Sequence, residues 1–409
     1  MERETVLVGL DVGTTKVAVL IGEVGRDGSL TVIGKGTVPM TGLKKGVVVN
    51  IEQTVNSIAA AVDEAERRSG WKIGRAFVAV GGQHVESQNS RGAVAVSGHD
   101  REVSREDVAR ATEVARAVSI PSNRDVLHVL PRGFAVDGQE GVKDPLGMSA
   151  IRLEVETHIV TASATAVQNL SKCIAAAGVG IEELVAAGLA SADAVLSETE
   201  KELGVAVADV GAGTIDLALF TEGAPLHTAV LPVGGNQVTN DIAIGLRTGL
   251  DVAEELKVRH GSARVGPVRA DEMIDVAGIG DEPGRQVSRL EVCRIIEARS
   301  REMLEMLREE MVRSGHGVLP AGVVLTGGGA QLAGLAELAR EVLDAPVRVA
   351  APSGFGGLVD GLLVPAYSTA IGLLLWGAAS LDGEPDRFES APARGGIGRL
   401  RDALRHVFP

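Results

Sequence analysis

Residues 6–25 of the chain read VLVGLDVGTTKVAVLIGEVG, and residues 205–223 read VAVADVGAGTIDLALFTEG. Each stretch is an apolar run that ends in Asp-Val-Gly, followed by small residues, a second apolar run and a closing Gly. This pattern predicts a strand, a turn and a strand. Either copy alone would be an ordinary hairpin, but two copies 198 residues apart indicate two similar half-domains that face each other across a nucleotide.

The chemistry of the two turns supports this interpretation. Glycines allow backbone N–H groups to approach phosphate oxygens, and threonine hydroxyls add further donors. The carboxylates of Asp11 and Asp209 end the first strand of each copy, where they are expected to face a cation. We therefore predict Mg²⁺ between them, held through water, because this ion prefers oxygen ligands and accompanies nucleotide phosphates.

A third glycine-rich element lies at residues 323–330, which read VVLTGGGA and precede a helical pattern over residues 332–343. Gly327, Gly328 and Gly329 would let a flat ring lie on the backbone without obstruction by Cβ atoms. A lone triple glycine could be a flexible connection. Here it is the third member of an ordered set.

Composition excludes several other classes of function. The net charge of −14 and the nine aromatic residues, six Phe, two Trp and one Tyr, argue against nucleic acid as a ligand. The two cysteines, Cys173 and Cys293, fit a reducing cytosol. We expect no secretory signal, and the apolar run at residues 371–379 is too short to span a bilayer.

The order DVGTTK, DVGAGTID, VVLTGGGA and PAYSTAIGLLL resembles the nucleotide-binding motifs of the actin-like ATPase superfamily. Within it, the chain resembles the FtsA family of bacterial cell-division proteins over nearly its whole length. The most specific markers are NSRG at 89–92, the stretch at 120–161, AGLASADAVLSETEKELG at 187–204 and VGGNQVTNDIAIGLRT at 233–248.

The resemblance implies an α/β, actin-like fold: two facing ribonuclease-H-like domains around a nucleotide cleft, with a small inserted subdomain called 1C. The implied boundaries are 1–82, 162–190 and 365–380 for subdomain 1A; 83–161 for 1C; 191–245 and 319–364 for 2A; and 246–318 for 2B. A linker at 381–394 and a membrane-targeting helix at 395–409 complete the division. Within the insert, the sequence itself predicts a strand at 92–96 and a helix at 104–117 that is capped by Ser104 and Asp107.

The resemblance also implies ATP with Mg²⁺ as ligands. Glu254 and Lys257 lie three residues apart on a helix and would reach the ribose and adenine, although charge pattern alone favours an ion pair within the helix. The implied nucleotide-binding residues are Gly13, Thr14, Thr15, Lys16, Gly211, Gly213, Thr214, Asp216, Gly235, Asn236, Glu254, Lys257, Gly327, Gly328 and Gly329. The metal would lie near Asp11 and Asp209. Asp209 is the candidate catalytic residue, and slow hydrolysis is expected because no Gln or Glu occupies residues 186–191.

The partners implied are copies of the same chain in a filament, the acidic tail of the tubulin-like protein FtsZ, and later division proteins that the 1C insert would help to recruit. The amphipathic pattern at residues 290–312 carries several arginines, of which Arg294 and Arg299 are candidates for the FtsZ contact because guanidinium groups suit carboxylates. Solubility alone would also account for them.

The C-terminal sequence favours contact with a membrane surface. A Pro-, Gly- and acid-rich stretch at 381–394 reads as a tether, and the segment after it has apolar residues at helical spacing with basic residues beside them. The candidate lipid-contacting residues are Ile397, Arg399, Leu400, Arg401, Leu404, Arg405, Val407 and Phe408. The alternative is a terminal helix that docks on its own domain.

Together with these features, the resemblance implies an ATP-binding protein that polymerises on the cytoplasmic face of the membrane at the division site and ties FtsZ filaments to anionic lipids there. One alternative is a small-molecule kinase of the same superfamily. Another is an adaptor of the pilus-assembly type, which shares the insert.

Overall fold

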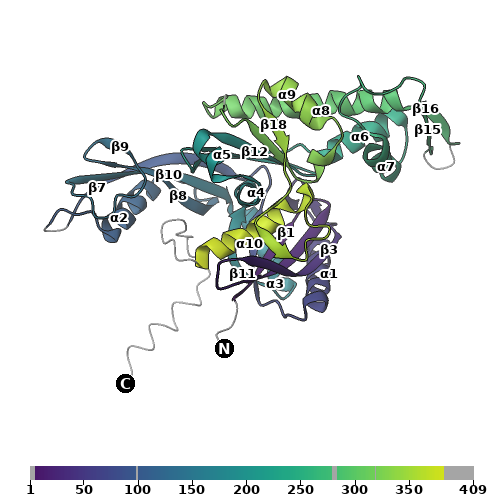
Figure 1. Ribbon diagram of the computed structural model, residues 1–409. Coiled ribbons are helices and arrows are strands. Elements are labelled where there is room, and N and C mark those ends of the chain that lie inside the picture. The colour runs from purple at the N-terminus through teal and green to yellow at the C-terminus, as the bar shows by residue number, and fades with distance from the viewer. Residues whose placement is uncertain (1–4, 98–99, 279–282, 318, 382–409) are drawn as a thin grey trace.

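The computed structural model describes residues 5–97, 100–278, 283–317 and 319–381. It has two lobes, each built on a mixed sheet, and an arm that extends from the side of the molecule (Figure 1). No helix in these described ranges is both long enough and apolar enough to cross a membrane.

The first lobe contains a six-stranded sheet with the order β11-β6-β1-β2-β3-β19. The first three strands form an antiparallel meander, and β6 and β11 extend the sheet in parallel beside β1. The strands are β1 (Thr5–Val12), β2 (Lys16–Val24), β3 (Leu30–Pro39), β6 (Arg75–Val80), β11 (Gly180–Ala186) and β19 (Phe355–Gly357). A two-stranded ribbon, β4 (Leu43–Lys44) and β5 (Val47–Val48), follows β3.

The second lobe repeats this topology. Its sheet has the order β14-β13-β12-β17-β18. Strands β12, β13 and β14 form an antiparallel meander, and β17 and β18 extend the sheet in parallel beside β12. The strands are β12 (Val205–Val210), β13 (Ile215–Thr221), β14 (Ala224–Leu231), β17 (Val323–Thr326) and β18 (Val347–Val349). The echo in the sequence is therefore a duplication of the fold.

Helices cover the faces of both sheets. Those of the first lobe are α1 (Ile51–Ser69), α3 (Ala164–Ala176) and α10 (Ser368–Leu381), whereas α4 (Ala187–Val195) packs on α10 and on strands β12 and β13 of the second sheet. Those of the second lobe are α5 (Glu198–Leu203), α6 (Gly235–Leu246), α7 (Leu250–His260), α8 (Arg289–Arg313) and α9 (Leu335–Leu343), with the hairpin of β15 (Met273–Val276) and β16 (Arg285–Ser288). There are also two short 3₁₀ helices in the described ranges. η1 (Gly328–Gln331) lies between β17 and α9, and η2 (Pro365–Tyr367) directly precedes α10.

The arm is a four-stranded antiparallel sheet, β7-β10-β8-β9, with α2 against it. Its elements are β7 (Glu86–Ala95), α2 (Arg105–Arg116), β8 (Arg124–Val136), β9 (Gln139–Val142) and β10 (Arg152–Ser163). Ser104 and Asp107 cap α2 reciprocally, as their spacing predicts. The arm has a small apolar core of its own, which includes Phe134, Leu153 and Val155.

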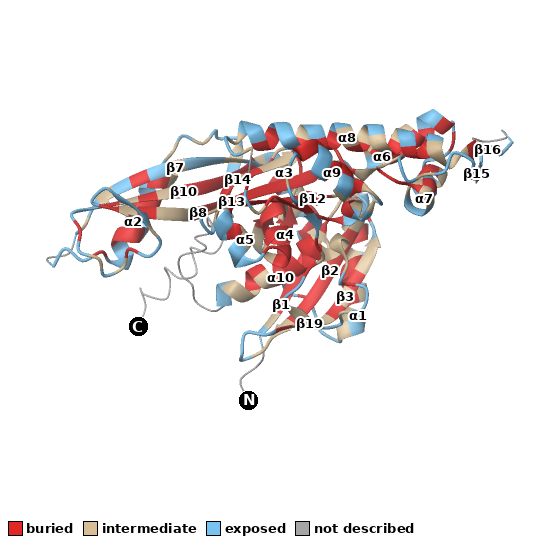
Figure 2. Cartoon of the chain, turned by 45° about the horizontal axis from the view of Figure 1, so that its top comes forward, coloured by how far each residue is buried: buried red, intermediate tan, exposed pale blue. Residues whose placement is uncertain are grey.

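Burial is densest in the central strands and in α4 and α10, which pack on each other (Figure 2). One apolar cluster joins Leu189 of α4, Ile371 of α10 and Val207 of β12, and so runs from one lobe into the other. The two lobes therefore share a continuous core.

The chain returns to the first lobe earlier than the expected boundary at residue 365. Strand β19, at Phe355–Gly357, already pairs in parallel with β3 of the first sheet, although the range 319–364 was expected to form subdomain 2A. A three-residue strand containing two glycines has too little apolar pattern to be recognised in sequence.

Candidate functional site

The two hairpin turns have the same internal geometry and touch each other. The N–H of Gly13 donates to the carbonyl of Lys16 over 2.9 Å, and the N–H of Gly211 donates to that of Thr214, also over 2.9 Å. A Cβ built on Gly213 would lie 2.6 Å from the hydroxyl oxygen of Thr14. Thr15, the next residue of the first turn, is exposed.

Three carboxylates gather beneath these turns. Asp11 and Asp209 occupy the ends of β1 and β12, and Asp216 lies opposite Asp209 in the β12–β13 register. The Asp209 side chain accepts hydrogen bonds from Ser191 at 2.5 Å and Thr369 at 2.8 Å. The hydroxyl of Thr214 donates to Asp216 over 2.9 Å, while the other carboxylate oxygen of Asp216 is buried without a partner among the described residues.

Burial changes the ionisation of all three groups. Desolvation raises the pKa of Asp11 to about 6 and that of Asp216 to about 8, and the charge of Asp209 adds to both shifts. Desolvation also raises the pKa of Asp209, against its hydrogen bonds from Ser191 and Thr369. Such a group of carboxylates needs either protons or a nearby cation in order to remain buried.

The described residues include no group of three His, Cys, Asp or Glu side chains placed to bind a metal ion. A divalent ion here would take most of its ligands from water and phosphate oxygens, which is how Mg²⁺ binds at many nucleotide sites. The unpartnered oxygen of Asp216 and the raised carboxylate pKa values fit an ion held in this indirect way.

The glycine loop after β17 approaches Asp209 very closely. Gly327 has φ +84°, and a Cβ on it would lie only 2.1 Å from a carboxylate oxygen of Asp209. A Cβ on Gly329 would lie 2.7 Å from Val210, whereas one on Gly328 would meet nothing nearer than Ala366, at 3.9 Å. Gly328 therefore faces open space, as a residue beneath a ligand ring would.

Helices α6 and α7 adjoin the second turn. The N–H groups of Gly235 and Asn236 donate to the carbonyls of Gly211 and Ala212 over 3.0 and 2.8 Å. Lys257 donates to the carbonyl of Gly235 over 3.2 Å and to Glu254 over 2.7 Å. The ion pair expected within the helix is present, and its lysine also reaches the turn.

The two turns, the glycine loop and the start of α6 with Lys257 of α7 thus belong to one network of contacts. Lys16 joins it from the first turn, where its ammonium donates to the carbonyl of Ala366 and lies 4.0 Å from the ring centroid of Tyr367. Ser191, Thr369 and Tyr367 were not predicted as site residues. The sequence signal that could have identified them is their position in AGLASAD and PAYSTA, two stretches rich in small residues.

The two candidate partner residues lie on α8 and differ in their surroundings. Arg294 is exposed, but Arg299 is half-buried and bonds Asp241 of α6 through two nitrogens, at 2.5 and 3.2 Å, and also Glu302. The expected linker at 381–394 has only Leu381 within the described residues. The residues expected to contact lipid, between 397 and 408, lie outside them.

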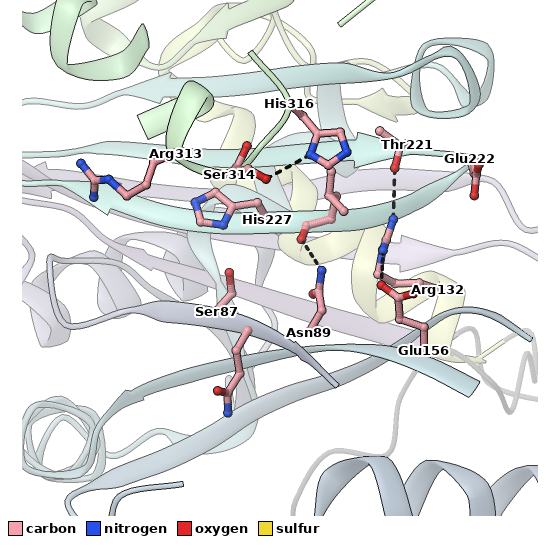
Figure 3. Close-up of a pocket in the computed structure, with 12 residues that line it drawn as sticks. Ser87, Asn89, Arg132, Glu156, Thr221, Glu222, His227, Arg313, Ser314 and His316 are labelled. Atoms are coloured by element: carbon pink, nitrogen blue, oxygen red, sulfur yellow. Dashed lines mark hydrogen bonds and ion pairs between the residues drawn. The ribbon is translucent and has the colours of Figure 1, made fainter. Parts of the chain in front are cut away.

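A hollow of about 780 Å³ lies between the arm and the second lobe (Figure 3). Arg132 reaches across it from β8 and donates to Thr221 of β13 over 3.1 Å and to Glu156 over 2.6 Å. Asn89 donates to the carbonyl of Leu226 over 3.0 Å. None of the predicted site residues lines this hollow, and its hydrogen bonds fasten the arm to the second lobe.

Comparison with family models gives matches in three parts of the chain. A model described as cell division protein FtsA matches residues 206–372, and the SHS2 domain inserted in FtsA matches residues 82–161. A model described as ethanolamine utilisation protein EutA matches residues 149–260.

Relatives named cell division protein FtsA match over most of the chain. The relative from Pseudomonas aeruginosa is 48% identical over 91% of this chain and 89% of its own length. Relatives from Escherichia coli K12 and Bacillus subtilis are each 41% identical, over 98% and 91% of this chain and 98% and 84% of their own.

Solved structures share the fold at low identity. The PilM–PilN type IV pilus biogenesis complex has a TM-score of 0.67 at 20% identity and covers 92% of this chain and 99% of its own. MreB5 of Spiroplasma citri bound to ADP has a TM-score of 0.55 at 14% identity over 92% and 98% of the two chains. The MamK double helical filament has a TM-score of 0.52 at 12% identity over 91% and 98%. The expected actin-like fold with its inserted domain is thereby confirmed.

Proposed function

Because the chain belongs to the FtsA family of cell-division proteins, we propose that it binds Mg·ATP between its two lobes and assembles on the cytoplasmic face of the membrane. There it would tie FtsZ filaments to the membrane and help to recruit later division proteins. The observation that carries the nucleotide assignment is the pair of hairpin turns that touch beside the buried carboxylates of Asp209 and Asp216 and the half-buried carboxylate of Asp11.

In this proposal, different groups of the chain bind different parts of the nucleotide. The free N–H groups and hydroxyls of the two turns bind phosphate oxygens, and Lys16 adds a positive charge. Gly328 gives the purine a flat surface, and Lys257 and Glu254 bind the ribose side. Magnesium bound with the nucleotide would supply the charge that lets Asp11, Asp209 and Asp216 ionise while buried.

Hydrolysis by this site is expected to be slow. Asp209 already accepts two hydroxyl donors, and residues 186–191 supply no Gln or Glu to orient a water molecule. The nucleotide would serve mainly to close the lobes and permit assembly. Two proteins of this fold support both parts of the proposal, since MreB5 was solved bound to ADP and MamK was solved as a double helical filament.

The contacts with other partners are proposed for surfaces outside the cleft. The acidic FtsZ tail would bind the face of α8 near Arg294, because that guanidinium is exposed to solvent. The arm would bind later division proteins and neighbouring copies. Residues 395–409 would bind anionic lipids through their apolar and basic side chains.

Electron microscopy of the full chain on an anionic lipid monolayer tests the proposal as a whole. Filaments that form on the lipid with Mg·ATP and are absent without nucleotide are the expected result. A soluble monomer under both conditions would contradict it. A kinase would instead consume ATP when sugars or acyl phosphates are added, and identities of 40–48% to cell-division relatives favour the filament over the pilus-type adaptor.

A further inference from the structure

Tyr367, the single tyrosine of the chain, lies between two lysines in the segment that leads into α10. The ammonium nitrogens of Lys16 and Lys35 are 4.0 and 4.1 Å from the centroid of its ring. Both distances are well inside the 6 Å or so at which an aromatic face attracts a cation. Lys16 begins β2, directly after the first hairpin turn, and Lys35 lies in β3.

The backbone around Tyr367 is tied to both lobes. The Ala366 carbonyl accepts from Lys16, and the Gly361 carbonyl accepts from Lys35 over 3.3 Å. On the side of the second lobe, Gly327 N–H donates to the Pro365 carbonyl over 3.1 Å. The segment at residues 361–367 therefore contacts both Lys16 and the glycine loop at Gly327.

The ammonium of Lys16 also faces the carboxylates of the cleft. Desolvation raises the pKa values of Asp11 and Asp209, and the positive charge of Lys16 opposes both shifts. An ammonium group has three N–H donors. The ring of Tyr367 and the carbonyl of Ala366 account for two directions, which leaves one for a ligand.

We propose that Tyr367 is a positioning residue that holds the Lys16 ammonium where its remaining N–H meets a phosphate oxygen of the nucleotide. Lysine loses much rotamer freedom when its ammonium is fixed, and a side chain that is already held loses less on binding. The inference rests on the proposed nucleotide function and adds to it a residue from outside the three glycine-rich elements.

Calorimetry with the full chain and Mg·ATP tests the role of the ring. Tyr367→Leu should weaken ATP binding by about threefold to thirtyfold, the range that a cation–π contact supports. Tyr367→Phe keeps the ring and should bind ATP within about twofold of the parent. Adenosine, which has no phosphate, should bind equally well to all three proteins.

A double-mutant cycle tests whether Tyr367 acts through Lys16. In a Lys16→Met background the further change Tyr367→Leu should have no effect on ATP affinity. An equal loss of affinity in both backgrounds, or no loss in the single Tyr367→Leu variant, overturns the inference. So does a loss of adenosine binding that matches the loss of ATP binding.

Titration of the single tyrosine gives a measurement that does not depend on nucleotide. Burial opposes ionisation, but hydrogen bonds with Thr37 and Lys35 and the charges of both lysines hold the pKa of Tyr367 below its ordinary value. Phenolate absorbance should therefore appear at higher pH in Lys16→Met than in the parent. If that shift is seen while the parent fails to bind ATP, the nucleotide function is overturned and this inference with it; if the parent binds ATP and the shift is absent, only this inference falls.

Discussion

At the scale of single residues, Gly327 and Gly328 are neighbours with opposite surroundings. Gly327 has a positive φ and its backbone lies very close to the Asp209 carboxylate, whereas Gly328 is exposed to solvent. A side chain at Gly327 disturbs the fold, but a side chain at Gly328 occupies space that the proposed ligand needs.

Gly328→Val should therefore leave thermal unfolding close to that of the parent and abolish Mg·ATP binding in calorimetry. Gly327→Ala is the comparison variant and should lose about 2 kcal/mol or more of stability, because it combines a left-handed backbone with a severe overlap. Parent-like ATP affinity in a folded Gly328→Val protein would remove the glycine loop from the nucleotide site.

Asp216 gives the second prediction at this scale, which concerns pH. The folded-state pKa, raised to about 8, lies above the unfolded value of 3.8, so the folded chain keeps a proton that the unfolded chain has lost. Stability from this group is present below about pH 4 and is lost as the pH rises through 8, at up to about 1.4 kcal/mol per pH unit.

Without nucleotide, Asp216→Asn should flatten the fall of the melting temperature between about pH 4 and 8, because an amide has no charge to bury. Asp63→Asn, at an exposed position in α1, is the matched control and should follow the parent. Equal slopes for Asp216→Asn and the parent would show that the carboxylate is already charged in the folded chain.

At the scale of elements, helix α8 carries two arginines with different surroundings, of which one stabilises the fold and the other is accessible to a partner. Arg299 forms ion pairs with Asp241 and Glu302, and the pair with Asp241 joins α8 to α6. Arg294 is exposed. The two substitutions should therefore have different effects, although both were predicted as contacts for the same acidic partner.

Arg299→Glu should cost about 1 kcal/mol or more of stability, since it places a third carboxylate beside Asp241 and Glu302. Arg294→Glu should unfold like the parent and weaken the binding of an FtsZ tail peptide, measured by fluorescence anisotropy, with an effect that shrinks as salt is added. Tight peptide binding by folded Arg294→Glu would place the contact elsewhere. Asp241→Asn separates loss of the ion pair from loss of charge at the surface.

The elements also show what the sequence could predict. Strands over 6–25 and 205–223, the cap of α2 and the helix at Glu254 follow from local patterns, and the structure confirms all of them. The helix expected at 332–343 begins only at Leu335, because a 3₁₀ turn comes first.

The contacts that sequence could not predict join residues far apart in the chain. Thr369 and Asp209 are 160 positions apart, and Lys16 and Ala366 are 350 apart. No local period encodes such pairs. They are set by the duplicated fold, which brings the end of the second lobe back over the first turn.

At the scale of the whole molecule, the lobes meet where α4 and α10 cross. A Cβ on Gly372 would lie 1.8 Å from the carbonyl oxygen of Ala190, so the two backbones touch. Small residues along both helices allow this approach, and Asp209 receives its hydroxyl donors Ser191 and Thr369 from the same two helices. The carboxylate of Asp209 is therefore hydrogen-bonded to both of the helices that cross between the lobes.

The membrane contact proposed for the C-terminal segment is weak for one molecule. Five apolar side chains that enter the headgroup boundary partially supply several kcal/mol at most, at about 0.8 kcal/mol per buried CH₂. Residues 394–409 carry four Arg and one Asp, a net charge of +3, and each basic residue near an anionic leaflet adds about 1 kcal/mol. A filament joins many such segments, so that after the first insertion each later one is intramolecular.

Deleting residues 395–409 should therefore leave ATP affinity unchanged and release the protein from anionic liposomes in a flotation assay. Leu404→Glu and Phe408→Glu should do nearly the same, because a carboxylate on the apolar side opposes both burial and lipid charge, while Asp402→Asn should bind at least as well as the parent. Avidity adds a further condition: the full chain should float more completely with Mg·ATP, which permits assembly, than without it. Flotation of the shortened chain at the level of the parent would refute the anchor and favour a segment that docks on its own domain.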